Sequence, residues 1–429
     1  MKARIGRHGR RHRAWLLAAA ALVQGCAGRP PVSTAPVEGA ACIVSDGAAP
    51  ARLRVAAAGP VDARNAPVPR TDGERLVFRQ LYETLVRVDC RGDVAAGLAE
   101  AWSTSDGGRS WTFRLRKGAT FTNGDTVTSE DVRNAWHLRA VDTTLAEVTA
   151  LNARELRVVL HDSASAPRIL ADSRYAITLA AATGAWPDGT GVYRVAAAGD
   201  RHIRLEARDP ALPAIDVEFT AADARAALDA GFDAVVSSDV ATIEYAGALP
   251  GYTAAQLPWN RTYMLVGADG AGEDADAATR SDLARDAVRG AVRPAEPSSG
   301  SRSARCGSAL PARGSTRAIA YPAGDPIARG LAERIAALAW PASRTPAWLR
   351  AHIRPADRAP VVLPMRADAL EQALHADSSL AFVIATPRTA VCGIAGTALV
   401  DARDHLLHRG NLGRVVADGD GSLRFGAAR

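Results

Sequence analysis

The amino-acid sequence predicts a mixed α/β protein divided into two lobes. Amphipathic helical patterns alternate with short strand-like runs along much of the 429-residue chain, as expected for helices packed on sheets. After the N-terminal export signal described below, 404 residues remain. A single hydrophobic core stops growing at roughly 250–300 residues, so we expect more than one core.

An ordered series of elements fills the stretch 74–136. The apolar side chains at 78, 81, 82 and 85 share one face of a predicted helix. Two strand-like runs joined by the glycine-containing turn 106–109 predict a hairpin. Thr128 and Asp131 have the spacing of a capping box, which predicts that a second helix begins there.

This series contains "YETLVRVD", "GLAEAW", an Asp-Gly-Gly turn, "WTFRLRKGATFTNGD" and a capped "SEDV" helix, in that order. It resembles the N-terminal lobe of the family 5 extracellular solute-binding proteins, which include the dipeptide-, oligopeptide- and nickel-binding components of ABC importers. The resemblance implies a two-lobed periplasmic-binding-protein-like fold with mixed sheets and hinge strands between the lobes. The alternative is an unrelated α+β domain with ordinary hairpins.

Later segments extend the resemblance to about residue 265. Residues 189–195 resemble the family's "GTGPY" turn, with Val192 in place of the proline. Residues 227–239 are similar to the helix and strand that close the first lobe, and Trp259–Val266 falls where such chains cross between lobes. Beyond this point the resemblance weakens, and the second lobe is shorter than in typical members.

The resemblance divides the chain into five parts. They are a signal peptide (1–25), a flexible lipoprotein stalk (26–50), lobe I (51–262), a shortened lobe II (263–385) and a C-terminal segment that returns to lobe I (386–429). In the second half we expect a helix capped by Asp325 and a helix near 368–375. We also expect a buried strand at 381–385 that is a candidate return crossing, and a terminal hairpin over 415–425.

Residues 1–25 are typical of an export signal. Six Lys and Arg side chains precede the apolar run Ala14–Val23, which is too short to span a bilayer. The run ends at Cys26 in a sequence that resembles a bacterial lipobox, although Gln24 departs from the usual small or apolar residue. We therefore expect an exported, periplasmic lipoprotein anchored to the membrane through lipid on Cys26. Plain cleavage near this point and twin-arginine export are the alternatives.

The basic character of the whole chain resides in this signal. Its removal leaves 46 basic and 46 acidic side chains, a net charge near zero. The remaining sequence has no block of Lys and Arg with interleaved aromatic residues, which argues against nucleic-acid binding.

Four cysteines remain once Cys26 is assigned to acylation, an even number in an exported protein. We favour Cys42 with Cys90 and Cys306 with Cys392, because each bridge closes a loop within one half of the chain. Four free buried thiols are the alternative. None of the spacings suits a zinc site.

The sequence contains no nucleophile elbow, phosphate-binding loop, zinc-protease motif or dinucleotide fingerprint, so an enzyme is not indicated and no cofactor is expected. His405 and His408, with Asp401 and Asp404, could bind a metal if they shared one helix face. A solvated amphipathic helix face is the preferred interpretation.

The resemblance places the ligand in a cleft between the lobes. Candidate ligand-binding residues are Trp259, Arg261, Tyr263, Tyr82 and Trp186, because aromatic walls suit varied side chains and an arginine can fix a charged terminus. For each of them, ordinary core or hinge packing is the alternative.

The function that the resemblance implies is a substrate-binding lipoprotein of an ABC importer. It would act as a monomer that binds a peptide or peptide-like solute and delivers it to a permease with its ATPase subunits. A degenerate, non-transporting paralogue that serves as an envelope interaction or sensory lipoprotein is the second hypothesis. An exported enzyme is the third.

Overall fold

The computed structural model describes residues 33–34, 42–138, 145–161, 167–181, 185–220, 224–266, 290–295, 318–338, 361–376, 380–387 and 396–426. Within these ranges, no helix has the length and apolar character that a membrane crossing requires.

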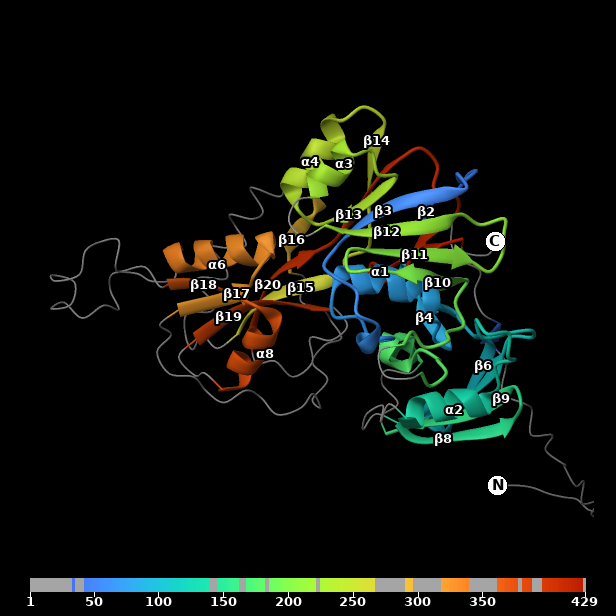
Figure 1. The fold of residues 1–429 in the computed structure, drawn as a ribbon. Coiled ribbons are helices and arrows are strands. Elements are labelled where there is room, and N and C mark those ends of the chain that lie inside the picture. The colour runs from blue at the N-terminus through green and yellow to red at the C-terminus, as the bar shows by residue number, and fades with distance from the viewer. Residues whose placement is uncertain are drawn as a thin grey trace, which may run out of the picture. The chain divides into compact units, whose positions relative to one another are not determined.

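A seven-stranded mixed sheet forms the centre of lobe I. Its strand order is β10-β11-β12-β3-β13-β21-β14, and the central strand β3 runs parallel to both β12 and β13. Helix α1 packs against β3 and β10, while α3 and α4 pack against β13, β3 and β14 (Figure 1). The elements are β3 (Arg52–Ala58), β10 (Tyr193–Ala198), β11 (His202–Ala207), β12 (Ala214–Thr220), β13 (Ala234–Ser237), β14 (Tyr252–Gln256), β21 (His405–Arg409), α1 (Asp72–Leu81), α3 (Ala224–Asp229) and α4 (Val240–Ala248).

Helix α1 is shorter than the periodicity predicted. Thr71 caps it by accepting a hydrogen bond from the Glu74 amide at 3.0 Å. The helix ends at Leu81 because the Gly191 amide, from the predicted glycine turn, donates to the Leu81 carbonyl at 2.9 Å. A Cβ on Gly191 would lie 2.1 Å from the Gln80 carbonyl oxygen, so this approach requires glycine. The expected extension of the helix to Leu85 is therefore wrong.

A second, antiparallel sheet in lobe I confirms the predicted hairpin and capping box. Gly107 and Gly108 adopt positive φ between β6 and β7, as the turn requires. The Thr128 amide donates to the Asp131 carboxylate at 2.8 Å, at the start of α2. The elements are β1 (Ser33–Thr34), β6 (Ala99–Ser105), β7 (Ser110–Leu115), β9 (Glu155–Leu160) and β8 (Leu145–Asn152) in that sheet order, α2 (Ser129–Leu138), and the separate pair β4 (Val86–Val88) and β5 (Val94–Ala96).

Lobe II is built on a six-stranded sheet of order β16-β20-β15-β19-β17-β18. Alternate residues of β15 bury against different helices: Tyr263 and Leu265 join the α6 cluster, and Met264 and Val266 join the α8 cluster. The two helices therefore cover opposite faces of the sheet (Figure 1). The elements are β15 (Arg261–Val266), β16 (Val292–Pro294), β17 (Ala318–Pro322), β18 (Val361–Met365), β19 (Leu380–Pro387), β20 (Gly396–Ala402), α6 (Pro326–Leu338) and α8 (Ala367–Ala376).

The return of the chain to lobe I differs from the expectation. The strand predicted at 381–385 is part of β19, which pairs with β15 and β17 inside the six-stranded sheet. The chain returns instead from β20, which pairs with β15 as far as Ala402, directly into β21 of the seven-stranded sheet. The six-stranded sheet thus continues past residue 386, where the C-terminal segment was predicted to begin.

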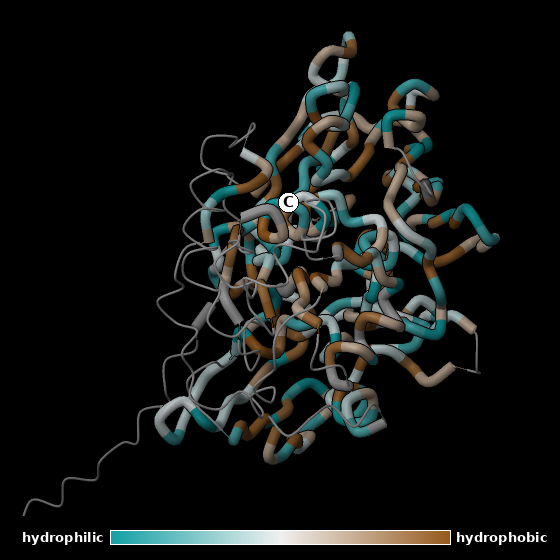
Figure 2. Tube along the Cα trace, turned by 90° about the vertical axis from the view of Figure 1, so that its left-hand side faces the viewer, coloured by the Kyte–Doolittle hydropathy of each residue, from teal (hydrophilic) through white to brown (hydrophobic). Residues whose placement is uncertain are grey.

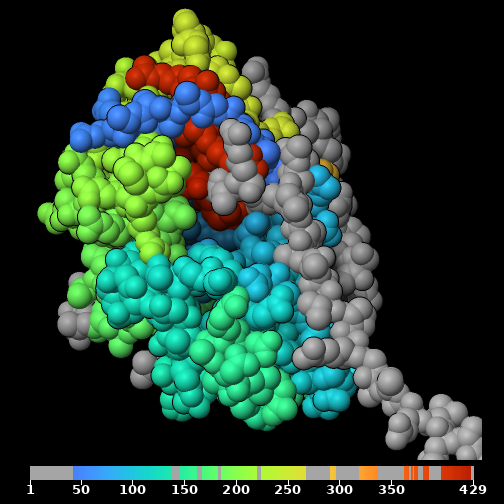
Figure 3. Space-filling view, turned by 90° about the vertical axis from the view of Figure 1, so that its right-hand side faces the viewer, coloured from blue at the N-terminus to red at the C-terminus, as the bar shows by residue number. Residues whose placement is uncertain are grey.

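The predicted terminal hairpin forms a three-stranded sheet with a strand from the N-terminal side. Its members are β2 (Ile43–Ser45), β22 (Val415–Ala417) and β23 (Leu423–Phe425). Strand β2 lies in the segment predicted as a flexible stalk, and a disulfide between Cys42 and Cys90 holds its start. Figure 3 shows C-terminal residues (red) beside residues from the start of the folded chain (blue).

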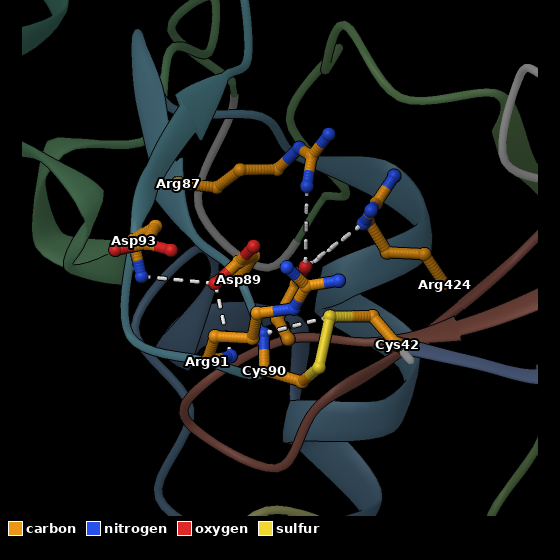
Figure 4. The surroundings of a disulfide bond; sticks show 8 residues. Cys42, Arg87, Asp89, Cys90, Arg91, Asp93 and Arg424 are labelled. Carbon is orange, nitrogen blue, oxygen red and sulfur yellow. Dashed lines mark hydrogen bonds and ion pairs between the residues drawn. A yellow bond between two sulfur atoms is a disulfide. The ribbon is translucent and has the colours of Figure 1, made fainter. Parts of the chain in front are cut away.

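Asp418, which follows β22, is buried among three arginines and is only 2% exposed. Arg79 donates to one carboxylate oxygen at 2.7 Å, Arg424 donates at 3.2 Å, and Arg87 lies 3.7 Å away. Figure 4 shows Arg87 and Arg424 pointing toward one carboxylate oxygen beside the disulfide. Burial alone would raise the pKa of Asp418, but the three guanidinium groups outweigh it and hold that pKa below its usual value.

The hydrophobic cores follow this division. One cluster joins α1 to the seven-stranded sheet and the terminal hairpin, a second fills the five-stranded sheet, and a third lies between α6 and the six-stranded sheet. Figure 2 shows apolar (brown) and polar (teal) residues alternating along the chain.

Candidate functional site

Two short segments connect the seven-stranded and six-stranded sheets. The first, 257–260, leads from β14 to β15, and the second, 403–404, leads from β20 to β21. They run side by side, because the Leu257 amide donates to the Asp404 carbonyl at 3.0 Å. We call these two segments, with the first residues of β15, the crossing.

Arg261 is the charged centre of the crossing. Its side chain is 13% exposed and forms ion pairs with Asp404 of the second segment and with Asp72 of α1, the latter at 3.8 Å. Burial disfavours its charge, but the two carboxylates raise its pKa above the ordinary value. Arg261 is therefore a permanent cation held by lobe I carboxylates at the base of a lobe II strand.

Each carboxylate has a second partner. Asn260 donates to the other oxygen of Asp404 at 3.0 Å, and Arg75 lies 3.2 Å from the other oxygen of Asp72. Burial would raise the pKa of Asp72, but Arg75 and Arg261 outweigh it and lower that pKa. All four carboxylate oxygens are engaged within the protein.

Tyr263, two residues further along β15, connects the crossing to α6. Its hydroxyl donates to the Asp325 carboxylate, whose oxygens lie at 2.9 and 3.0 Å. That carboxylate also accepts the Ile327 and Ala328 amides, which confirms the predicted cap of α6. Burial raises the pKa of Tyr263, and Asp325 raises it further. Burial also raises the pKa of Asp325, because its hydrogen bonds and Arg261 only partly offset the lost solvation.

Trp259 packs between arginines on the crossing. The guanidinium carbons of Arg403 and Arg293 lie 4.2 and 4.5 Å from the centre of its ring, within the range of cation–π attraction. Arg293 also pairs with the buried Asp401 at 3.2 Å. Burial and the neighbouring Arg293 lower the pKa of Arg403. Trp259 therefore already contacts charged side chains of the protein through its ring, whereas Arg261 does so through ion pairs.

Tyr82 and Trp186 belong to a different cluster. Both contact Phe78 of α1 edge to face, with ring centres 5.8 and 6.1 Å from it. Tyr82 is 3% exposed, and burial, with a smaller contribution from Asp188, raises its pKa. The structure thus brings Trp259, Arg261 and Tyr263 together at the crossing and puts Tyr82 and Trp186 in the α1 core.

A small cavity of about 20 Å³ adjoins the crossing. Its volume suits a single water-sized group. The cavity is lined by residues of α1, β13, the second crossing segment, the β22–β23 turn and the start of β23, namely Asp72, Arg75, Leu76, Val236, Asp404, Gly421, Ser422 and Leu423. Both carboxylates that hold Arg261 therefore face this cavity.

The sequence did not identify these carboxylates as partners of Arg261. Asp404 was predicted on a helix face with His405 and His408, but residues 405–409 form strand β21. His405 and His408 cannot converge there, because residues three apart in a strand point to opposite faces. Within the described ranges, no group of three His, Cys, Asp or Glu side chains is arranged to hold a metal ion. Nothing in the sequence around Asp72 indicated a contact with Arg261.

The remaining predicted site residues are cysteines. The disulfide between Cys42 and Cys90 is one of the two favoured pairings. Cys26, Cys306 and Cys392 lie outside the described residues.

Known proteins match this chain in sequence and in fold. Residues 93–231 match the family model described as bacterial extracellular solute-binding proteins, family 5 Middle. Over 75 residues the chain is 44% identical to the periplasmic oligopeptide-binding protein OppA of Haemophilus influenzae, which covers 17% of this chain. That match spans only 14% of the length of the relative.

Structural likeness extends much further along the chain. NikA from Staphylococcus aureus, solved with Ni(L-His)2, superposes with a TM-score of 0.63 at 13% identity and covers 87% of this chain and 98% of its own. The murein tripeptide-binding protein MppA of Escherichia coli superposes with a TM-score of 0.57 at 16% identity, over 78% of this chain and 79% of its own. These likenesses confirm the two-lobed periplasmic-binding-protein fold with mixed sheets. With the match over residues 93–231, they confirm the resemblance to the family 5 extracellular solute-binding proteins that was inferred from the sequence.

Proposed function

We propose that this protein captures a small peptide or peptide-like solute at the crossing and delivers it to the permease and ATPase subunits of an ABC importer. The supporting observation is the crossing itself. From alternate positions of strand β15, Arg261 reaches α1 of lobe I through Asp72, and Tyr263 reaches α6 of lobe II through Asp325. A solute that contacts these side chains can bias both lobes at once, which is how lobe closure is coupled to binding.

The class of solute is inferred from the relatives. OppA is named an oligopeptide-binding protein, MppA a murein tripeptide-binding protein, and NikA was solved with a nickel–histidine complex. All of these ligands carry amino-acid groups. We therefore expect a solute of one to a few amino-acid units.

A thermal-shift screen tests this function. The protein without residues 1–26 is melted with pools of di- to pentapeptides, amino acids and nickel–histidine. A ligand at a hundred times its dissociation constant adds about 2.7 kcal/mol to the free energy of unfolding, which raises Tm by several degrees. A shift that Arg261→Ala or Trp259→Leu changes, but Arg329→Ala on the exposed face of α6 does not, supports capture at the crossing.

The second candidate is a non-transporting paralogue that acts in envelope interaction or sensing. The observation that favours it is that Trp259, Arg261 and Tyr263 are each engaged by the protein's own side chains. If no pool raises Tm, this candidate replaces transport.

Attachment to the membrane through Cys26 is a further part of the proposal. Labelling cells with a radioactive or clickable fatty acid tests it. We expect labelled full-length protein in the membrane fraction, and unlabelled protein from the Cys26→Ala variant. Soluble, unlabelled wild-type protein would instead indicate plain cleavage of the signal.

A further inference from the structure

A short segment beside the crossing contacts both lobes. Ala291 is 0% exposed and belongs to the hydrophobic cluster that α3 and α4 form with the seven-stranded sheet. The next three residues form β16, the edge strand of the six-stranded sheet, which pairs with β20 (Figure 1). Val292 packs against the clusters of both lobes. We call residues 290–294 the brace, because this segment bridges the two sheets alongside the two crossing segments.

The brace is bonded to both crossing strands. The Arg403 amide donates to the Ala291 carbonyl at 3.0 Å. Arg293, Asp401 and Thr262 are lateral neighbours on β16, β20 and β15, so their side chains share one face of the sheet. The buried Asp401 carboxylate accepts the Thr262 hydroxyl at 2.7 Å and pairs with Arg293 at 3.2 Å. Side chains therefore tie the three strands together in addition to the backbone hydrogen bonds.

Trp259 joins all three segments at one ring. It comes from the first crossing segment, Arg403 comes from the second, and Arg293 comes from the brace. The two guanidinium carbons lie 4.2 and 4.5 Å from the centre of the ring. Burial and repulsion from Arg293 lower the pKa of Arg403. Asp401 neutralises Arg293, and the electron-rich ring of Trp259 offsets the repulsion that remains.

A ribbon of three adjacent strands bends easily in one direction. Bending out of its plane spreads small torsional changes along each strand, whereas sliding one strand against another breaks the hydrogen bonds between them. A third strand therefore restricts any relative motion of the two sheets to one bend, as long as the strands stay in register. Trp259 lies just beyond the paired strands, because β15 begins at Arg261 and β20 ends at Ala402.

We propose that the brace is a third hinge strand and that Trp259 is the positioning residue that keeps the three strands in register, so that the lobes close by one bend. Trp259 acts through Arg293 and Arg403 and not by contact with the solute. The effect on solute affinity rests on the proposed function. The restriction of motion does not, because it is a property of the three strands.

The first experiment measures the motion without a solute. p-Acetylphenylalanine in place of Arg194 on β10 and of Arg329 on α6 carries spin labels at exposed positions of the two lobes. Double electron–electron resonance then gives the distribution of distances between the labels. Trp259→Leu should broaden this distribution, whereas Trp259→Phe, which keeps an aromatic face, should leave it close to that of wild type. Trp111→Leu on β7 is the matched control and should not broaden it.

An unchanged distribution in Trp259→Leu, or equal broadening in Trp111→Leu, would overturn the positioning role. If Trp259→Leu cannot be purified, Arg403→Gln takes its place. Arg403 Nε donates to the Gly290 carbonyl, and glutamine keeps a donor there while it removes one cation from the ring. The same broadening is expected of this variant.

The second experiment separates positioning from solute contact. It uses a set of tripeptides that differ in one side chain. Trp259→Leu should weaken the binding of all of them by one common factor of about fivefold, because loss of the cation–π contacts lowers the fraction of molecules in the binding-competent state. No weakening, or factors that differ among the peptides, would contradict the proposal. A wild type that binds no peptide, together with a broader distribution in Trp259→Leu, removes the proposed function and keeps the third hinge strand.

Discussion

Two clusters of arginine and aspartate among the described residues have opposite arrangements. At Asp418, one carboxylate lies among Arg79, Arg87 and Arg424. At the crossing, the single guanidinium of Arg261 lies between two carboxylates. The groups are the same, but Arg261 lies on a connection between the two sheets and both of its aspartate partners line the small cavity described above.

The two clusters differ in the elements that they connect. The partners of Asp418 come from α1, β4 and β23, and Asp418 follows β22 next to the disulfide at Cys90, so its cluster anchors the terminal hairpin to lobe I. The partners of Arg261 come from α1 and the second crossing segment, where the chain passes between the seven-stranded and six-stranded sheets. We therefore propose that the Asp418 cluster serves stability, whereas the crossing, which connects the two sheets, serves solute binding.

The largest loss of stability is expected from the variant Asp418→Asn. It leaves three arginines around a neutral side chain, and breaking a buried charge pair costs about 3–5 kcal/mol. Because the folded protein lowers the pKa of Asp418, its contribution is present above the ordinary aspartate pKa of about 4 and is lost as pH falls further. Urea unfolding should show the full loss at about pH 7 and a smaller one at about pH 3. A loss under about 1 kcal/mol at neutral pH would contradict the anchoring role.

The disulfide, which holds the same part of lobe I, should contribute nearly as much to the free energy of unfolding. Cys42 and Cys90 are separated by 48 positions, for which the chain-entropy model predicts about 4 kcal/mol. The double variant Cys42→Ala/Cys90→Ala should lower the free energy of unfolding accordingly, measured by urea unfolding of the oxidised protein. The disulfide and Asp418 are adjacent, so the losses of unfolding free energy caused by the cysteine double variant and by Asp418→Asn should not add when the two changes are combined. Strict additivity would show that the two act separately.

A smaller loss of stability is expected at the crossing. Arg261→Ala removes charge-assisted hydrogen bonds worth about 2 kcal/mol, and Asp72, which is 36% exposed, can be rehydrated afterwards. The variant should therefore be clearly more stable than Asp418→Asn in the same urea assay. An equal or greater loss of stability would mean that Arg261, like Asp418, mainly stabilises the fold.

The smallest change in the free energy of unfolding, and the only gain, is expected from Asp325→Asn. The folded protein raises the pKa of Asp325, so its ionised form is relatively disfavoured above the unfolded pKa of about 4, and the penalty disappears below it. Asparagine keeps the cap of α6 and an acceptor for Tyr263. We expect a gain below about 1 kcal/mol at pH 7 and none at pH 3, by chemical denaturation. Destabilisation at pH 7 would show that Tyr263 requires the ionised carboxylate.

Much of lobe I was predictable because its elements carry local signals. The turn at 106–109, the capping box at Thr128 and the glycine turn at 189–191 each need particular residue types at fixed positions. The helix end at Leu81 was not predictable, since it depends on an amide from the distant Gly191.

The positions of the crossing residues were predictable in part for the same reason, and their role in ligand binding stays a prediction. Trp259, Arg261 and Tyr263 lie in one continuous stretch, so a single motif identified all three. Their partners Asp404, Asp72 and Asp325 come from segments more than sixty residues away along the chain, and the sequence alone does not pair distant charges. Asp404 was in addition assigned to a helix, because His405 and His408 have helical spacing although the segment is a strand.

The most direct test of the central claim is hydrogen exchange with and without the solute that raises Tm most. A solute held at the crossing should slow exchange in residues 257–266, 402–405 and the first turn of α1. Exchange in β4 and β22, which lie beside Asp418 and contribute no residue to the cavity lining, should stay unchanged. Protection confined to β4 and β22, or absent from the crossing while the solute is bound, would contradict the assignment of the two clusters.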